Sequence, residues 1–87
     1  MRALLALRTP AEARALLADL CTPAEVRAFA ERLEVARLLN AGGLSYRDIA
    51  ERVGASTTTV VRVARFLREE PHGGYRLILE RLKAPVP

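Results

Sequence analysis

The sequence predicts an all-α protein of six short-to-medium helices, and three observations support that prediction. Alanine, leucine and arginine, which all favour helices, dominate the 87 residues. Apolar residues recur at the three- and four-residue spacing of a helix rather than at the alternation of a strand. Threonine, serine, proline and glycine stand where helices would begin and end.

Helix starts are marked most clearly by the motif TPAE, which occurs at residues 9–12 and again at 22–25. In each copy threonine would be the N-cap, proline the first helical residue, and glutamate the second member of a capping box. Glycines and a proline then mark helix ends. The six expected helices cover about residues 2–7, 10–20, 23–40, 46–53, 57–70 and 75–82.

The third expected helix has an unusually wide apolar surface. Val26, Phe29, Ala30 and Leu33 form a stripe at helical spacing, and Val35, Leu38 and Leu39 widen it. One neighbouring helix cannot cover such a surface. Because a chain this short buries only a modest core by itself, we expect a homodimer.

Composition and charge limit the class of protein. The formal net charge is +4, and between Gly54 and Arg68 there are three arginines and no acidic residue. Such a patch suits a polyanion, although arginine also serves as an ordinary surface residue. No apolar run approaches the ~20 residues of a membrane span. Cys21, the single cysteine, allows no internal disulfide, which fits a reducing cytoplasm.

The segment GAS, residues 54–56, separates the fourth and fifth expected helices. Gly54 can turn the chain sharply, Ser56 can cap the next helix, and Ala50 leaves room for two helices to cross. Apolar side chains would fill the inside of this corner. The spacing predicts a helix-turn-helix, with an ordinary helical hairpin as the alternative. The corner residues are Ile49, Val53, Val60 and Val63.

The fifth helix, although rich in β-branched residues, would present small residues first and arginines later on its outer face. Threonine hydroxyls could reach base edges, and Val61 could contact a thymine methyl. Arg62 and Arg65 could reach phosphates, and Arg62 also a guanine. We therefore expect double-stranded DNA as the partner. The candidate DNA-binding residues are Tyr46, Arg47, Ser56, Thr57, Thr58, Thr59, Val61, Arg62 and Arg65.

Catalytic chemistry is not indicated. His72, the only histidine, lies in the turn PHGG and has no serine or cysteine partner at a credible spacing. No Cys/His cluster suggests a metal, and the glycine pairs match no phosphate loop. We expect no enzyme activity, no catalytic residue, no metal and no cofactor.

The segment LCTPAEVRAFAERLEVARLLNAGGLSYRDIAERVGASTTTVVRVARFL resembles the Trp repressor superfamily, and most of all its YerC/YecD-type branch. The resemblance extends through GGYRLILERL. It implies an all-α, intertwined homodimer whose two helix-turn-helix units face DNA. It also implies one Trp repressor-like helical DNA-binding domain at residues 1–83, followed by a frayed tail at 84–87.

The resemblance further implies a ligand pocket that uses Arg32 and Arg62. In the Trp repressor a glycine lies against the indole, and this chain has Val63 there. It also has Phe66 in place of a serine. We therefore expect a regulator that does not respond to tryptophan, and that binds DNA either without an effector or in response to a smaller, unknown ligand.

A second resemblance covers only the middle of the chain. LSYRDIAERVGAS is similar to the promoter-reading helix-turn-helix of sigma factors. The expected function is a sequence-specific DNA-binding transcriptional regulator. The alternative is a protein-interaction or sigma-region-4-like module that binds the transcription machinery.

Overall fold

The computed structural model describes residues 2–83, so Met1 and the expected frayed tail at 84–87 lie outside the described part of the chain. The described residues form helices and no strand, which confirms the all-α prediction. The first helix ends two residues before its expected end, and the fifth ends at Arg68 rather than just before Pro71. The helices are α1 Arg2–Leu5, α2 Pro10–Leu20, α3 Pro23–Ala41, α4 Tyr46–Val53, α5 Thr57–Arg68 and α6 Gly74–Lys83.

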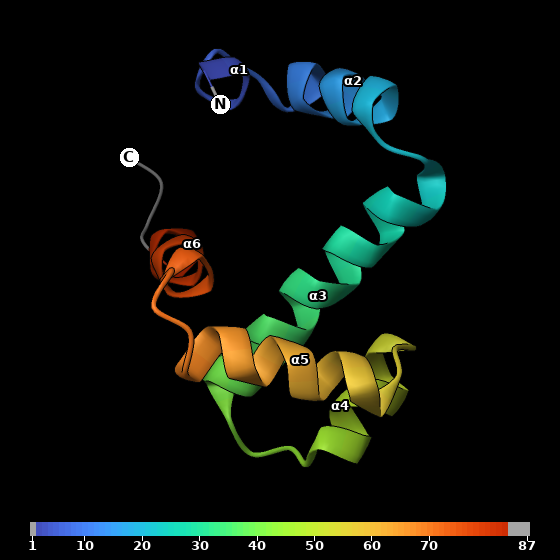
Figure 1. The fold of residues 1–87 in the computed structure, drawn as a ribbon, viewed down its shortest axis with the longest axis vertical. Helices are drawn as coiled ribbons and strands as arrows, with labels where there is room; N and C mark the ends of the chain where they lie inside the picture. The colour runs from blue at the N-terminus through green and yellow to red at the C-terminus, as the bar shows by residue number, and fades with distance from the viewer. Residues whose placement is uncertain (1, 84–87) are drawn as a thin grey trace.

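Helices α1 and α2 lie at the top of the view in Figure 1, away from α4, α5 and α6. The long helix α3 begins beside α2 and continues into the lower half of the molecule, where it packs against α4, α5 and α6. No residue of α1 or α2 is buried within this single chain. The amino-terminal helices therefore gain little from packing inside one subunit.

The hydrophobic core lies where α3, α4 and α5 meet, and α6 adds Leu79 to it. Three of the four residues expected inside the helix-turn-helix corner, Ile49, Val60 and Val63, are completely buried. Val53 is partly buried and packs against the edge of the core. This packing fixes the angle between α4 and α5. The sequence pattern predicted the helix-turn-helix motif but not this angle.

The two TPAE motifs begin α2 and α3 as expected, but their caps differ. Thr22 Oγ1 accepts a bond from the Glu25 amide, and the Glu25 carboxylate accepts one from the Thr22 amide at 2.8 Å. This complete capping box lowers the pKa of Glu25, chiefly through the bond from the Thr22 backbone. At the first motif Thr9 caps α2, but the Glu12 carboxylate accepts from the amide of Arg8 instead. The predicted reciprocal box is therefore wrong there, because the carboxylate reaches one residue further back.

The turn between α4 and α5 depends on the backbone of Gly54. This residue has φ +79° and ψ 27°, the left-handed conformation that residues with a side chain rarely adopt. A Cβ atom at Gly54 would meet nothing within 4 Å, so the requirement is conformational rather than steric. The amides of Gly54 and Ala55 both donate to the Ala50 carbonyl, which closes the turn.

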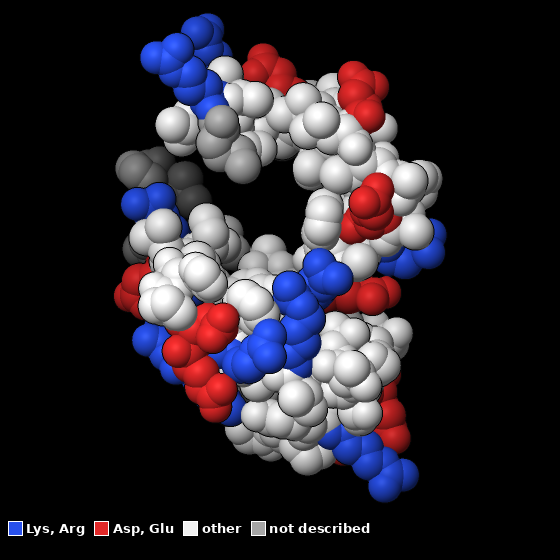
Figure 2. Space-filling view, viewed as in Figure 1, with Lys and Arg blue, Asp and Glu red and all other residues white. Residues whose placement is uncertain are grey.

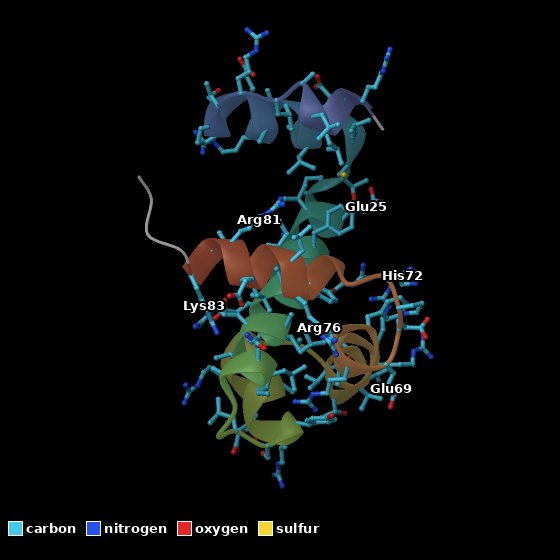
Figure 3. The ribbon with its side chains drawn as sticks, turned by 90° about the vertical axis from the view of Figure 1, so that its left-hand side faces the viewer. Glu25, Glu69, His72, Arg76, Arg81 and Lys83 are labelled. Carbon is cyan, nitrogen blue, oxygen red and sulfur yellow. The ribbon has the colours of Figure 1, made fainter. Side chains whose placement is uncertain are left out.

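Helix α6 is tied to the end of α5 through Arg76, whose side chain lies between the two helices in Figure 3. Its Nε donates to the Leu67 carbonyl at 2.8 Å, and its Nη2 donates to the Arg68 carbonyl at 3.2 Å. The last carbonyls of a helix lack partners within it, so this guanidinium satisfies two of them. None of the helices in the range 2–83 is long and apolar enough to cross a membrane.

Candidate nucleic-acid interface

Helix α5 presents two faces of different chemistry. Its inner face is buried against α3 and α4, and its outer face is open to solvent. Val61 lies on the outer face and keeps 55% of its surface exposed. The buried residues are Val60, Val63, Ala64 and Leu67; the exposed ones are Thr57, Thr58, Val61, Arg62, Arg65 and Arg68.

The first turn of α5 is held by hydroxyl groups. Ser56 Oγ accepts a bond from the Thr59 amide at 3.1 Å, and the two hydroxyls lie 3.1 Å apart. Ser56 is exposed and Thr59 is half-buried. These two candidate residues therefore have a local capping role, whereas the hydroxyls of Thr57 and Thr58 lie on the exposed surface beside them. The short side chains let another molecule approach this helix end closely.

The start of α4 adds two further candidates to the same region. Tyr46 is exposed, and its hydroxyl accepts a bond of 3.2 Å from Arg68 Nη1 at the end of α5. Arg47 is highly exposed and lies 3.6 Å from Glu51 one turn along the helix. A surface pair at this distance holds the arginine only weakly. Tyr46 thus belongs to the α4–α5 surface, while Arg47 projects from α4 by itself.

Positive charge gathers on this face of the molecule. Figure 2 shows a cluster of basic side chains across the middle of the view, where Figure 1 places α5. Helix α5 has no acidic residue in its first turn and has Arg65 and Arg68 in its last turn. In the described chain, neither Arg62 nor Arg65 lies within salt-bridge distance of a carboxylate. Their charges are therefore available to an external anion.

Arg32 and Arg62, the candidate ligand residues, line one cavity of about 560 Å³ between α3, α5 and α6. Phe66 also lines it, and the Arg62 guanidinium carbon lies 4.5 Å from the centre of the Phe66 ring. Val63 does not line this cavity, because its side chain is completely buried in the core. Arg32 and Arg62 therefore face the same space, and Phe66 rather than Val63 is the substituted residue that lines it.

Three residues near the interface were not among the sequence-based candidates. Arg68 contacts Tyr46, and Phe66 contacts the two outer arginines. His72, expected as a solvated loop residue, is exposed but stacks on Phe66 with ring centres 5.9 Å apart. The spacing of Phe66 four residues after Arg62 was the one available signal, since side chains four apart meet on a helix.

Together these features define a helix-turn-helix protein with a cationic outer helix. The family model described as Trp repressor protein matches residues 1–83. The chain belongs to the Trp repressor family, whose members regulate transcription. This confirms the first resemblance noted in the sequence.

Similar proteins support the same assignment. The chain is 45% identical over 65 residues to YerC of Bacillus subtilis (strain 168), a match that spans 75% of this chain and 61% of YerC. A TrpR-like protein from Eubacterium eligens has a TM-score of 0.87 at 38% identity, over 99% of this chain and 87% of the other. A proposed Trp repressor from Staphylococcus aureus has a TM-score of 0.86 at 34% identity, over 99% and 84%.

Proposed function

We propose that this protein is a sequence-specific DNA-binding transcriptional regulator that acts as a homodimer and places α5 in the major groove. The observation that supports this most is the outer face of α5, which combines exposed small residues with two arginines, Arg62 and Arg65, that form no salt bridge within residues 2–83. The packing of α5 against α3 and α4 leaves this face uncovered.

The outer face of α5 has two kinds of residue that suit the major groove of DNA: short or apolar ones for the base edges and arginines for the phosphates. A major groove admits a helix when the residues at its entering end are short, which Thr57 and Thr58 satisfy. The exposed methyl groups of Val61 suit the methyl group of thymine. Arg65 and Arg47 lie on the flanks, where phosphates of the two strands would pass, and their role would be to fix position rather than to read sequence.

Dimer formation is supported by the apolar surface that one chain leaves open. Large apolar residues on α1, α2, α3 and α6 are exposed, and no residue of α1 or α2 is buried. Covering apolar surface stabilises association by roughly 25 cal/mol per Å². The entropy that chains and side chains lose on association offsets part of this gain. A second copy of the chain would cover these helices. The exposed residues are Leu4, Leu5, Leu20, Phe29, Leu33, Leu77, Ile78 and Leu82.

The proposed regulator does not use L-tryptophan as a corepressor. The ring of Phe66 lines the cavity between α3, α5 and α6 and lies against the Arg62 guanidinium, where an indole would stack. An indole would have to displace this ring or share the space with it. Inserting volume into an occupied site typically costs about 1–3 kcal/mol, and about 1.4 kcal/mol is tenfold in affinity.

A gel shift over a salt series tests the DNA-binding function. Genomic or random fragments should bind, and log K should fall with log salt by about 0.9 per phosphate contacted. A protein-interaction module that used the same face would show no such dependence. Absence of binding at low salt, or binding that does not weaken as salt rises, would contradict the proposal. Selection of bound fragments from a random pool would then give the preferred sequence.

A further inference from the structure

The ring of Phe66 lies against two of the arginines that we propose contact DNA. The guanidinium carbon of Arg62 is 4.5 Å from the ring centre, and that of Arg65 is 5.1 Å away. Both distances are within the ~6 Å range at which a cation is attracted to an aromatic ring. One side chain on the flank of α5 therefore contacts both cationic groups.

A cation–aromatic contact differs from a salt bridge in a way that matters for binding an anion. Arg37 pairs with Glu34 and Arg47 lies near Glu51, so part of their charge is balanced inside the protein. A ring attracts a guanidinium without balancing its net charge. A ring also accepts no conventional hydrogen bond from the guanidinium N–H groups, so these remain available to oxygen atoms. The contact with the ring can therefore hold Arg62 and Arg65 without an acidic partner.

Phe66 is itself held in place by its surroundings. It is half-buried, and it lines the cavity together with Phe29, Tyr75 and Ile78. His72 stacks on it at 5.9 Å with an angle of 18° between the rings. A ring stacked on His72 in this way can restrict two long side chains that would otherwise lose much rotamer freedom when DNA binds.

We propose that Phe66 is a positioning residue for DNA binding, which holds the guanidinium groups of Arg62 and Arg65 as a pair ready to contact the phosphate backbone. This inference rests on the proposed function, because it requires that α5 contacts DNA. It assigns a role to a residue that need not touch DNA.

The first test compares Phe66→Leu with Phe66→Tyr in the full-length protein, with DNA affinity measured by fluorescence anisotropy on a selected fragment. Phe66→Leu keeps an apolar side chain but removes the ring, and we expect about three- to tenfold weaker binding. Phe66→Tyr keeps the ring and should restore wild-type affinity. The slope of log K against log salt should stay unchanged, since the number of phosphate contacts is the same. Thermal melts check that each variant folds, and Phe66→Met replaces Phe66→Leu if the latter does not.

The second test is a double-mutant cycle, which isolates the coupling between residues. In a background of Arg62→Gln and Arg65→Gln, Phe66→Leu should have no further effect on DNA affinity. A purely structural role for Phe66 would give the same loss in both backgrounds and would overturn the proposal.

A third measurement does not depend on DNA. The side-chain protons of Arg62 and Arg65 should show ring-current shifts in the NMR spectrum of the free protein, and these shifts should vanish in Phe66→Leu and persist in Phe66→Tyr. If the wild type binds no DNA, the proposed function fails, whatever these shifts show. If the wild type binds DNA and Phe66→Leu binds equally well, the positioning role is wrong and the proposed function stands.

Discussion

The hydroxyl of Tyr46, the first residue of α4, accepts a hydrogen bond of 3.2 Å from Nη1 of Arg68, the last residue of α5. The two residues also line one shallow cavity of about 290 Å³ on the outer surface, together with Val61 and Arg65. The bond joins the beginning and the end of the helix-turn-helix at the face proposed to meet DNA. Because both side chains are exposed, its main effect should be on binding rather than on stability.

Removing the Tyr46 hydroxyl tests this relationship. Tyr46→Phe should lower the free energy of unfolding by less than about 1 kcal/mol, because an exposed hydrogen bond contributes little. It should weaken DNA binding about three- to tenfold if the hydroxyl and the guanidinium act on the same phosphate. Arg68→Gln should have a comparable effect, and the double variant should be less than additive. If Tyr46→Phe binds DNA with wild-type affinity, the Tyr46 hydroxyl does not contribute to the DNA interface.

Substitutions on α5 should separate sequence reading from general attraction. Thr58→Ala and Val61→Ala remove groups that would face base edges, so each should relax preference at particular base pairs, at a cost of about 1–3 kcal/mol on the best site. Binding to unrelated DNA should change little. Selection of DNA from a random pool with each variant measures this directly. Unchanged preference in both variants would mean that another surface reads the sequence.

Arg47→Ala tests the other kind of contact, general attraction to the phosphate backbone, and serves as the control for Thr58→Ala and Val61→Ala. This side chain projects from α4 and has only the weak contact with Glu51 at 3.6 Å, so its loss should leave stability almost unchanged. Affinity should fall alike for every DNA sequence, and the salt slope should become smaller by about one phosphate contact. Arg65→Ala should behave the same way. A change of sequence preference in Arg47→Ala would contradict its assignment to the backbone.

Leu33→Asp tests the proposed dimer. Leu33 keeps 37% of its surface exposed in one chain and lies on the apolar side of α3. An unpaired charge buried between two chains costs several kcal/mol, so the dissociation constant of the dimer should rise at least about 100-fold. Sedimentation should show the change, and circular dichroism should show lost helix, since α1 and α2 have no buried residues of their own.

Val61→Asp provides the control for the dimer test. It introduces the same charge at an exposed position on the proposed DNA face. It should leave the dimer intact while it abolishes DNA binding. A stable, folded wild-type monomer at micromolar concentration would contradict the dimer outright.

Titration calorimetry with L-tryptophan tests the proposed absence of a corepressor. The wild type should give no saturable heat at micromolar concentrations, because Phe66 occupies the space beside Arg62. Phe66→Ser should open that space and bind tryptophan more tightly than the wild type does. One tryptophan per wild-type subunit, together with a rise in DNA affinity, would show instead that the protein is tryptophan-responsive.

The sequence by itself determined the features that depend on residues within about four positions of one another. Thr22 and Glu25 cap α3, Gly54 turns the chain, and the apolar spacing in α5 selects its buried face. Such features are readable because backbone conformation and helical periodicity follow from the local residue types. The location of most candidate DNA-binding residues on one surface follows from the same periodicity.

Only the tertiary structure decided which distant groups meet. Tyr46 and Arg68 lie 22 positions apart, and Arg76 reaches back to the carbonyl of Leu67. The cavity that Arg32 of α3 and Arg62 of α5 line together likewise forms only where those helices and α6 pack. These contacts depend on the angles at which helices cross, and those angles are set by the sum of many side-chain contacts. No single motif encodes that sum, which is why the contact of Arg68 with Tyr46 emerged only once the helices were packed.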